Sequence, residues 1–170
     1  MKILVTGGAG FIGSHLVEEL LSNENEILIF DNCLTGKKEN LEMTGNFKFI
    51  IDDFGSENSL EEIEKFDPDV CFHLAAQSSV VVSVENPALD FEHNILQPIK
   101  LIQVLLKSNC KKLVFTSSGG TIFGEPSVIP TGEEDYADEP ESPYGVAKKR
   151  LNELIKIMTN NSNLKYSILN

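Results

Sequence analysis

The feature that most constrains the fold is a cluster of glycines between two segments with different apolar periods. Residues 2–6 form a short apolar run typical of a buried strand, and residues 11–21 carry apolar residues at helical spacing. Glycines at this junction permit a tight turn, bring the helix close to the strand and let the backbone approach a pyrophosphate. The N-terminus of such a helix also offers free N–H groups to an anion. The cluster satisfies both G-x-G-x-x-G and G-x-x-G-x-x-G, through Gly7, Gly8, Gly10 and Gly13.

Short apolar runs alternate with helix-length segments along the rest of the chain. The predicted strands are residues 2–6, 26–30, 47–51, 70–76, 112–116 and 165–169. The predicted long helices are residues 144–158 and residues 91–106, where Pro98 should cause a kink or remove one hydrogen bond. Because parallel strands need crossover helices, this order predicts an α/β fold, a Rossmann-type doubly wound parallel sheet of about six strands with helices on both faces. We expect one domain over residues 1–170, with the long loop 119–141 near its site.

The charge balance argues against two classes of partner. The chain has 26 Asp and Glu against 14 Lys and Arg, a net charge of −12, whereas binding to nucleic acid or anionic lipid needs a concentrated cationic surface. No apolar stretch approaches the roughly 20 residues that span a bilayer, and there is no cleavable signal pattern. We therefore expect a cytoplasmic protein with no nucleic-acid or membrane partner. No disulfide is predicted, because the three cysteines Cys33, Cys71 and Cys110 are an odd number and lie far apart in the sequence. No metal site is predicted either, because neither the cysteines nor His15, His73 and His93 have the spacing of metal ligands.

An acid closes the second predicted strand. Asp31 follows the glycines by roughly 20 residues, where a carboxylate can accept hydrogen bonds from the 2′-hydroxyl of an adenosine ribose. The same carboxylate would repel a 2′-phosphate, so NAD is favoured over NADP. Lys37 and Lys38 lie just downstream and keep NADP open as an alternative.

A tyrosine and a lysine share one face of the last predicted helix. Tyr144 and Lys148 are four residues apart, one helical turn from each other. An ammonium beside a phenol favours the phenolate, so we expect Lys148 to lower the pKa of Tyr144. Such a tyrosine can remove a proton from a substrate hydroxyl while hydride leaves its carbon. The alternative is a surface lysine beside a tyrosine that only packs, and the glycine turn upstream favours the catalytic interpretation.

Further motifs follow the glycine turn in a fixed order. They are Asp31-Asn32, Asp53, the run from His73 to Gln77, Asn94, the run from Thr116 to Ser118, and the run from Ser142 to Lys148. With residues 6–13, they make essentially the whole chain resemble the extended short-chain dehydrogenase/reductases. Within these, it resembles the NAD-dependent nucleotide-sugar epimerases and dehydratases, with the UDP-glucose 4-epimerases as the nearest type.

The resemblance implies an NAD site and a catalytic group. The residues that it assigns to NAD are Gly7, Gly10, Phe11, Ile12 and Gly13 around the pyrophosphate, Asp31 and Asn32 at the adenosine ribose, Asp53 and Phe54 at the adenine, Leu74, Ala75 and Ala76 along the cofactor, and Lys148 at the nicotinamide ribose. The implied catalytic residues are Ser118, Tyr144 and Lys148. Tyr144 would take the proton of a sugar 4-hydroxyl while hydride passes to NAD, and hydride would return to the other face of the 4-keto intermediate.

The segment around Ser118 departs from the family pattern. One alignment places Gly119 at the catalytic serine or threonine position, whereas an alignment with an extra glycine places Ser118 there, with Ser117 as a reserve. We choose Ser118, which would bind the reacting sugar hydroxyl. The sugar dehydratases carry an Asp-Glu pair after this position, and the glycines here supply no such carboxylates.

The resemblance also implies a partner and a missing portion. Relatives continue into a C-terminal portion that supplies most of the nucleotide-sugar pocket, and we expect that portion to be absent from residues 1–170. Relatives commonly form homodimers through their two long helices, here residues 91–106 and 144–158. The alternatives to an epimerase are a non-catalytic NAD-binding module and a sugar-nucleotide dehydratase or reductase of the same family.

Overall fold

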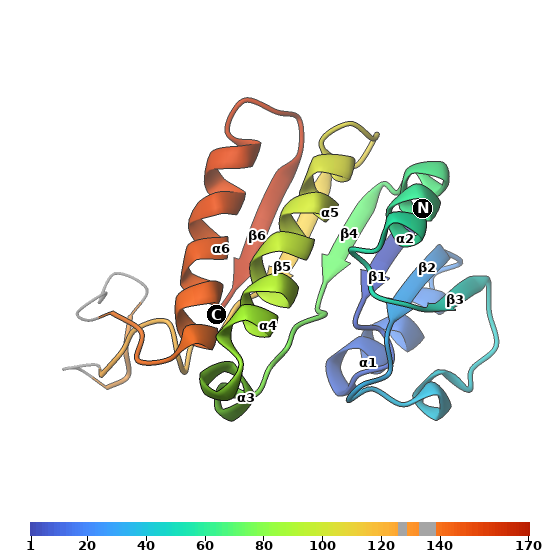
Figure 1. Ribbon diagram of the computed structural model, residues 1–170. Helices are drawn as coiled ribbons and strands as arrows, with labels where there is room; N and C mark the ends of the chain where they lie inside the picture. Colours follow the sequence, from blue (N-terminus) through green and yellow to red (C-terminus); the bar gives the residue numbers. More distant parts are fainter. Residues whose placement is uncertain (126–128, 133–138) are drawn as a thin grey trace.

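Six parallel strands form one sheet in a computed structural model that describes residues 1–125, 129–132 and 139–170. The spatial order is β3-β2-β1-β4-β5-β6, so the direction of the crossovers reverses between β1 and β4 (Figure 1). This confirms the doubly wound parallel sheet, in which ligands bind at the carboxyl ends of the strands beside the reversal. The strands are β1 Lys2–Thr6, β2 Glu26–Asp31, β3 Phe47–Ile51, β4 Val70–His73, β5 Lys112–Thr116 and β6 Lys165–Leu169.

Helical segments connect the strands, and several begin at a capping side chain. Ser56 Oγ accepts a hydrogen bond from the N–H of Ser59, and Ser142 Oγ accepts one from the N–H of Gly145. These caps satisfy N–H groups that the first turn of a helix leaves free. The segments are α1 Phe11–Leu21, η1 Lys38–Leu41, α2 Glu57–Phe66, α3 Val80–Glu85, α4 Pro87–Phe91, η2 Glu92–Leu96, α5 Gln97–Leu105 and α6 Pro143–Thr159.

The core consists of two apolar clusters, one on each face of the sheet. Helix α1, through Val17, and segment η1, through Leu41, pack over β1 and β2. Helices α2, α5 and α6 pack on the opposite face, where Phe30 and Phe115 are fully buried. Alternate residues of each strand point to opposite faces, so the short apolar runs supply both clusters at once.

The predicted helix over residues 91–106 is three segments in the structure. Helix α4 leads into η2, a π-helical turn, and then into α5. Pro98 lies in the first turn of α5, directly after the π turn. Proline has no N–H and its ring collides with the carbonyl four residues earlier in a regular α-helix, so the wider turn before it accommodates the ring. The expected disturbance at Pro98 is therefore a π turn, and helical geometry continues through it.

The fourth strand is shorter than predicted. The chain leaves the sheet after His73, and the N–H of Leu74 still donates to the carbonyl of Thr6 over 3.0 Å. Residues 74–76 therefore form a loop at the carboxyl edge of the sheet instead of the end of a strand. Within the predicted loop 119–141, residues 126–128 and 133–138 lie outside the described residues.

No helix in the described ranges is long and apolar enough to cross a membrane. The same part of the chain contains no group of three or more His, Cys, Asp or Glu side chains that could hold a metal ion.

His73 is a buried core residue at the end of β4. Its ring stacks on Phe115 and meets Phe54 edge-on, with ring centroids 5.6 and 4.8 Å apart. Its Nδ1 lies 2.7 Å from Thr6 Oγ1. Burial, together with the positive charge of Lys148, lowers the pKa of His73 to about 3, so its imidazole is neutral at physiological pH.

Acid should destabilise the fold through His73. Between pH 6.5 and about 3 the unfolded chain binds a proton at this position and the folded chain does not, so stability falls as the pH falls. We expect a loss of up to about 1.4 kcal/mol per pH unit from this group. Urea unfolding measures this loss by comparing the parent with His73→Asn, whose side chain does not titrate. The difference between their free energies of unfolding should shrink as the pH falls. A difference that stays constant through the window would contradict the assignment.

Candidate functional site

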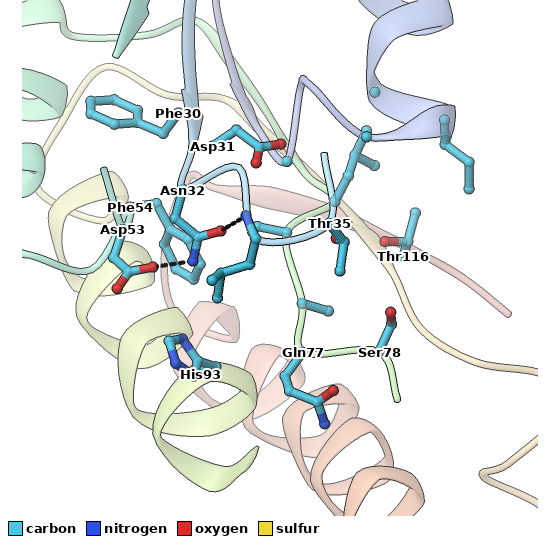
Figure 2. A pocket seen from close by; sticks show the side chains of 18 of the residues that line it. Phe30, Asp31, Asn32, Thr35, Asp53, Phe54, Gln77, Ser78, His93 and Thr116 are labelled. Atoms are coloured by element: carbon cyan, nitrogen blue, oxygen red, sulfur yellow. Dashed lines mark hydrogen bonds between the residues drawn. The ribbon is translucent and has the colours of Figure 1, made fainter. Parts of the chain in front are cut away.

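A cavity of about 560 Å³ opens at the carboxyl ends of β1, β2 and β4, where the strand order reverses. In Figure 2, Asn32 and Asp53 lie toward one end of this cavity, and Ser78 and Thr116 lie toward the other. The structure brings together at its wall every residue that the sequence assigned to NAD except Lys148: Gly7, Gly10, Phe11, Ile12, Gly13, Asp31, Asn32, Asp53, Phe54, Leu74, Ala75 and Ala76.

The glycine turn packs so closely on neighbouring backbone that side chains at Gly7 and Gly13 would collide with it. Gly7 has a φ of +76°, and a Cβ there would lie 2.6 Å from the backbone nitrogen of Ala75. A Cβ on Gly13 would overlap the carbonyl oxygen of Gly7. Gly10 is the residue before α1, and no side chain caps the first N–H groups of that helix. The side chain of Phe11 is 81% exposed. A backbone cradle with free N–H groups at a helix N-terminus fits a pyrophosphate.

Asp31 ties the second strand to the glycine turn. Its Oδ2 accepts a hydrogen bond from the N–H of Ala9 over 2.9 Å, and its Oδ1 accepts one from the N–H of Cys33 over 2.8 Å. Each carboxylate oxygen has a further lone pair, so the group can also accept from a ribose hydroxyl. The sequence predicted the ribose contact but not the two backbone contacts, which hold the carboxylate in one orientation.

Asn32 and Asp53 form the adjoining part of the wall. Asn32 Nδ2 donates to Asp53 Oδ1 over 2.6 Å, and Asn32 Oδ1 accepts from the N–H of Leu34 (Figure 2). The neighbouring Asp52 accepts hydrogen bonds from the hydroxyls of Ser56 and Ser59, which hold its pKa below the usual range. These bonds fix the loop after β3, which carries Asp53, to the start of α2.

The cavity also has lining residues that the sequence did not assign. Gln77 belongs to the motif from His73 to Gln77, but the sequence predicted no role for its side chain in lining the cavity. Position alone could have suggested the residues next to assigned ones, whereas His93 comes from η2 and required the tertiary structure. The unassigned lining residues are Phe30, Leu34, Thr35, Asp52, Gln77, Ser78, Ser79, Val82, Leu89, His93 and Thr116.

Ser118 and Tyr144 meet beside this cavity. The hydroxyl of Ser118 is hydrogen-bonded to the phenol of Tyr144. Ser118 Oγ also accepts from the hydroxyl of Thr121 over 2.8 Å. In contrast, the hydroxyl of Ser117 is buried, with no hydrogen-bond partner among the described residues. Of the alternatives that the sequence left open, the geometry brings Ser118 to Tyr144.

Lys148 is buried next to Tyr144. Its ammonium donates to the carbonyl of Thr116 over 3.0 Å and lies 4.6 Å from the ring centroid of Phe115 and 5.9 Å from that of Tyr144. Burial lowers the pKa of Lys148 to about 8, and the charge of Asp90 opposes that shift. Thr116 lines the cavity with its side chain and holds Lys148 with its carbonyl, so it links the pair to the cavity.

The expected lowering of the Tyr144 pKa is not found. Burial raises the pKa of Tyr144, the hydrogen bond from Ser118 partly opposes this, and the negative charge of Asp90 adds to it. Helical spacing placed Lys148 one turn from Tyr144, but desolvation of the phenol is the larger effect in this structure. A phenolate here therefore needs more stabilisation than the lysine alone provides.

Comparisons with known proteins agree with this geometry. The NAD dependent epimerase/dehydratase family matches residues 3–170. A putative UDP-glucose 4-epimerase of Methanocaldococcus jannaschii is 41% identical over 167 residues, covering 98% of this chain and 54% of the relative. The structure of UDP-glucose 4-epimerase from Thermotoga maritima with UDP-glucose has a TM-score of 0.92 at 40% identity, covering 99% of this chain and 54% of the other. The UDP-glucose 4-epimerase of Thermus thermophilus in complex with NAD has a TM-score of 0.89 at 40% identity and the same coverages. The chain thus spans about half the length of these relatives.

Proposed function

The chain belongs to the NAD dependent epimerase/dehydratase family, and from that premise we propose that it forms the NAD-binding half of a nucleotide-sugar 4-epimerase. The observation that carries the proposal is the contact of Ser118 with Tyr144 beside a cavity whose wall holds the glycine turn and Asp31. Similarity to UDP-glucose 4-epimerases over nearly the whole chain supports a UDP-sugar as substrate.

NAD fits the cavity through residues of three loops. Gly7 and Gly13 let the turn pack closely on neighbouring backbone, where any side chain would collide, and the free N–H groups at the N-terminus of α1 would hold the pyrophosphate. Asp31 and Asn32 would accept hydrogen bonds from the adenosine ribose, and Asp53 with Phe54 would border the adenine. The loop after β4, Leu74 to Ala76, would line the cofactor.

Proton transfer is the work of Tyr144, Ser118 and Lys148. When bound, NAD supplies an acceptor for the hydride from the sugar carbon and a donor for its return. Tyr144 takes the proton of the sugar 4-hydroxyl and gives it back in the second half of the reaction. Ser118 orients that hydroxyl through the contact that it already makes with Tyr144. The ammonium of Lys148 contributes to stabilising the phenolate, but it does not by itself offset the burial of Tyr144.

The other family reactions receive less support. Elimination of water needs an acid and a base beside the catalytic hydroxyl residue, and Gly119 and Gly120 follow Ser118 in this chain. A non-catalytic NAD-binding module would leave the buried Tyr144 without a task. The assay of the parent protein described below distinguishes both alternatives, because only an epimerase converts UDP-glucose into its 4-epimer.

We further propose a homodimer through the helical stretch of residues 91–106, which contains η2 and α5, and through α6. Helices α5 and α6 pack against each other on one face of the sheet (Figure 1). Leu96, at the end of η2, is 50% exposed, and Ile157 on α6 is 72% exposed. A second copy of the chain that packs on this face would bury both side chains, and the resemblance to dimeric relatives makes a second copy the partner.

Asp31→Asn should relax the choice between NAD and NADP. The variant keeps an acceptor for the backbone but removes the charge that repels a 2′-phosphate. The dissociation constant of NADP divided by that of NAD should therefore fall about tenfold or more. Titration calorimetry with both cofactors measures the ratio. Glu39→Gln, the same charge change at an exposed position of η1, is the control and should leave the ratio unchanged. An unaltered ratio in Asp31→Asn would show that Asp31 does not face the ribose.

Tyr144→Phe should abolish epimerisation and spare cofactor binding. We expect turnover of UDP-glucose to fall about 100-fold or more, because general acid–base catalysis is lost, with little change in NAD affinity. The assay uses the natural gene product that contains residues 1–170, and Tyr166→Phe on β6 is the matched control. Equal losses of turnover and of NAD affinity would make Tyr144 a structural residue. Full turnover in the variant would exclude the proposed mechanism.

Leu96→Glu should separate the dimer. A carboxylate buried between two copies is strongly disfavoured, whereas on a half-exposed position of a monomer it costs little. Native mass spectrometry reports the subunit number and any bound NAD in one spectrum. Ile51→Glu, on edge strand β3 and 56% exposed, is the control that should stay dimeric. A parent chain that is monomeric at all accessible concentrations would refute the dimer.

A further inference from the structure

A buried carboxylate, Asp90, lies on α4, which packs against the helix that carries Tyr144 and Lys148, and the sequence assigned it no role. Its side chain is fully buried. Both hydrogen bonds that it accepts go to Oδ1, and Oδ2 has no hydrogen-bond partner among the described residues. Carboxylates are rarely buried this completely unless a positive charge or several donors compensate. The surroundings of Asp90 should therefore reveal what its charge does.

The two donors to Asp90 form a closed network with the loop after β4. Gln77 Nε2 and Asn94 Nδ2 donate to Asp90 Oδ1 over 2.7 and 2.9 Å. Asn94 Nδ2 also donates to the carbonyl of Gln77, and Asn94 Oδ1 accepts from its N–H. The side chain of Gln77 in turn bonds the N–H and the carbonyl of Ser79. Asp90 thus fixes the backbone of residues 77–79, which lines the cavity.

The charge of Asp90 acts on both titratable members of the catalytic group. Helix α4 and the π turn pack against α6, which carries Tyr144 and Lys148. The carboxylate raises the pKa of Lys148 against the effect of burial, and it raises the pKa of Tyr144. Burial raises the pKa of Asp90, whereas the hydrogen bonds from Gln77 and Asn94 and then the charges of Lys148 and His93 lower it. Among the described residues, Lys148 also acts on His73 of β4, which stays neutral.

We propose that Asp90 is a positioning residue of this site: its carboxylate is the buried counter-charge of the Lys148 ammonium, and through Gln77 and Asn94 it holds the loop that lines the cavity. Without it, the desolvated ammonium would have the carbonyl of Thr116 and aromatic rings around it among the described residues. The amides of Gln77 and Asn94 orient Asp90 Oδ1, and no hydrogen bond reaches Oδ2 from the part of the chain that the structure describes. The catalytic meaning of this counter-charge rests on the proposed function, but its existence can be measured without any reaction.

The test is the titration of Lys148 by NMR in protein labelled with ¹³C at lysine Cε. The Lys148 signal is assigned by its loss in Lys148→Arg. In the parent chain its midpoint should lie near pH 8. In Asp90→Asn, which retains an oxygen acceptor for Gln77 and Asn94 but no charge, the midpoint should fall by about one pH unit. A lysine that is largely protonated at pH 7 would then be about half neutral.

The matched control is Glu92→Gln, two residues further along the same helical stretch. Glu92 is partly exposed, and its carboxylate lies 3.9 Å from Lys100. This variant removes the same charge from the protein and should leave the Lys148 midpoint unchanged. An equal midpoint in Asp90→Asn and in the parent would overturn the proposal, as would equal shifts in Asp90→Asn and Glu92→Gln. A structural role alone would lower the unfolding temperature of Asp90→Asn without moving the midpoint.

A reciprocal measurement covers the case in which Asp90→Asn does not fold. Coupling between two charges is mutual, so Lys148→Met must raise the pKa of Asp90 by the amount that Asp90 raises that of Lys148. The ¹³Cγ signal of Asp90 reports this, and an unchanged Asp90 midpoint would overturn the proposal. NAD affinity is measured separately by calorimetry. A chain that shows the coupling but binds no NAD would reject the proposed function while leaving the role of Asp90 intact.

Discussion

The backbone contacts of one residue, Ala9, hold the site together. Its N–H donates to Asp31 at the end of β2, and its carbonyl accepts from the N–H of Lys37 and the side chain of Asn40. Through these bonds the glycine turn after β1 fixes the loop after β2. The same glycine turn also contacts the loop after β4, because Gly7 approaches the backbone of Ala75 so closely that no Cβ fits between them. The cavity therefore exists because three loops converge on backbone atoms, and the glycines are the condition for that convergence.

Local sequence signals predicted the parts of the fold and the site that depend on backbone geometry. The glycine turn and the acid at the end of β2 act through short-range steric and electrostatic requirements, so their roles can be inferred from spacing. The order of strands and helices followed from apolar periods for the same reason. The π turn before Pro98 and the clamp of Asp90 on Gln77 depend on which elements meet in three dimensions. No spacing rule connects Asp90 to Lys148, which lie on different helices 58 positions apart in the sequence.

The sequence spacing and the folded structure predict opposite shifts for the pKa of Tyr144. The four-residue spacing to Lys148 favoured an acidic phenol, yet burial raises its pKa. Both groups lose water when α4, the π turn and α6 pack together, and desolvation disfavours each charged form on its own. The charge that acts on both groups is that of Asp90, which raises the pKa of each.

Keeping a cation at Lys148 opposes folding. Moving its pKa from 10.5 to about 8 corresponds to roughly 3 kcal/mol against the charged form. A methionine of similar length would pack in the same place without this cost, since buried charges are often replaced by apolar residues with no loss of stability. A position that retains both a desolvated ammonium and a desolvated carboxylate is thus poorly explained by stability. The arrangement makes sense where a proton must be placed precisely beside a cavity, because a buried charge pair controls protonation more strongly than the same charges in water.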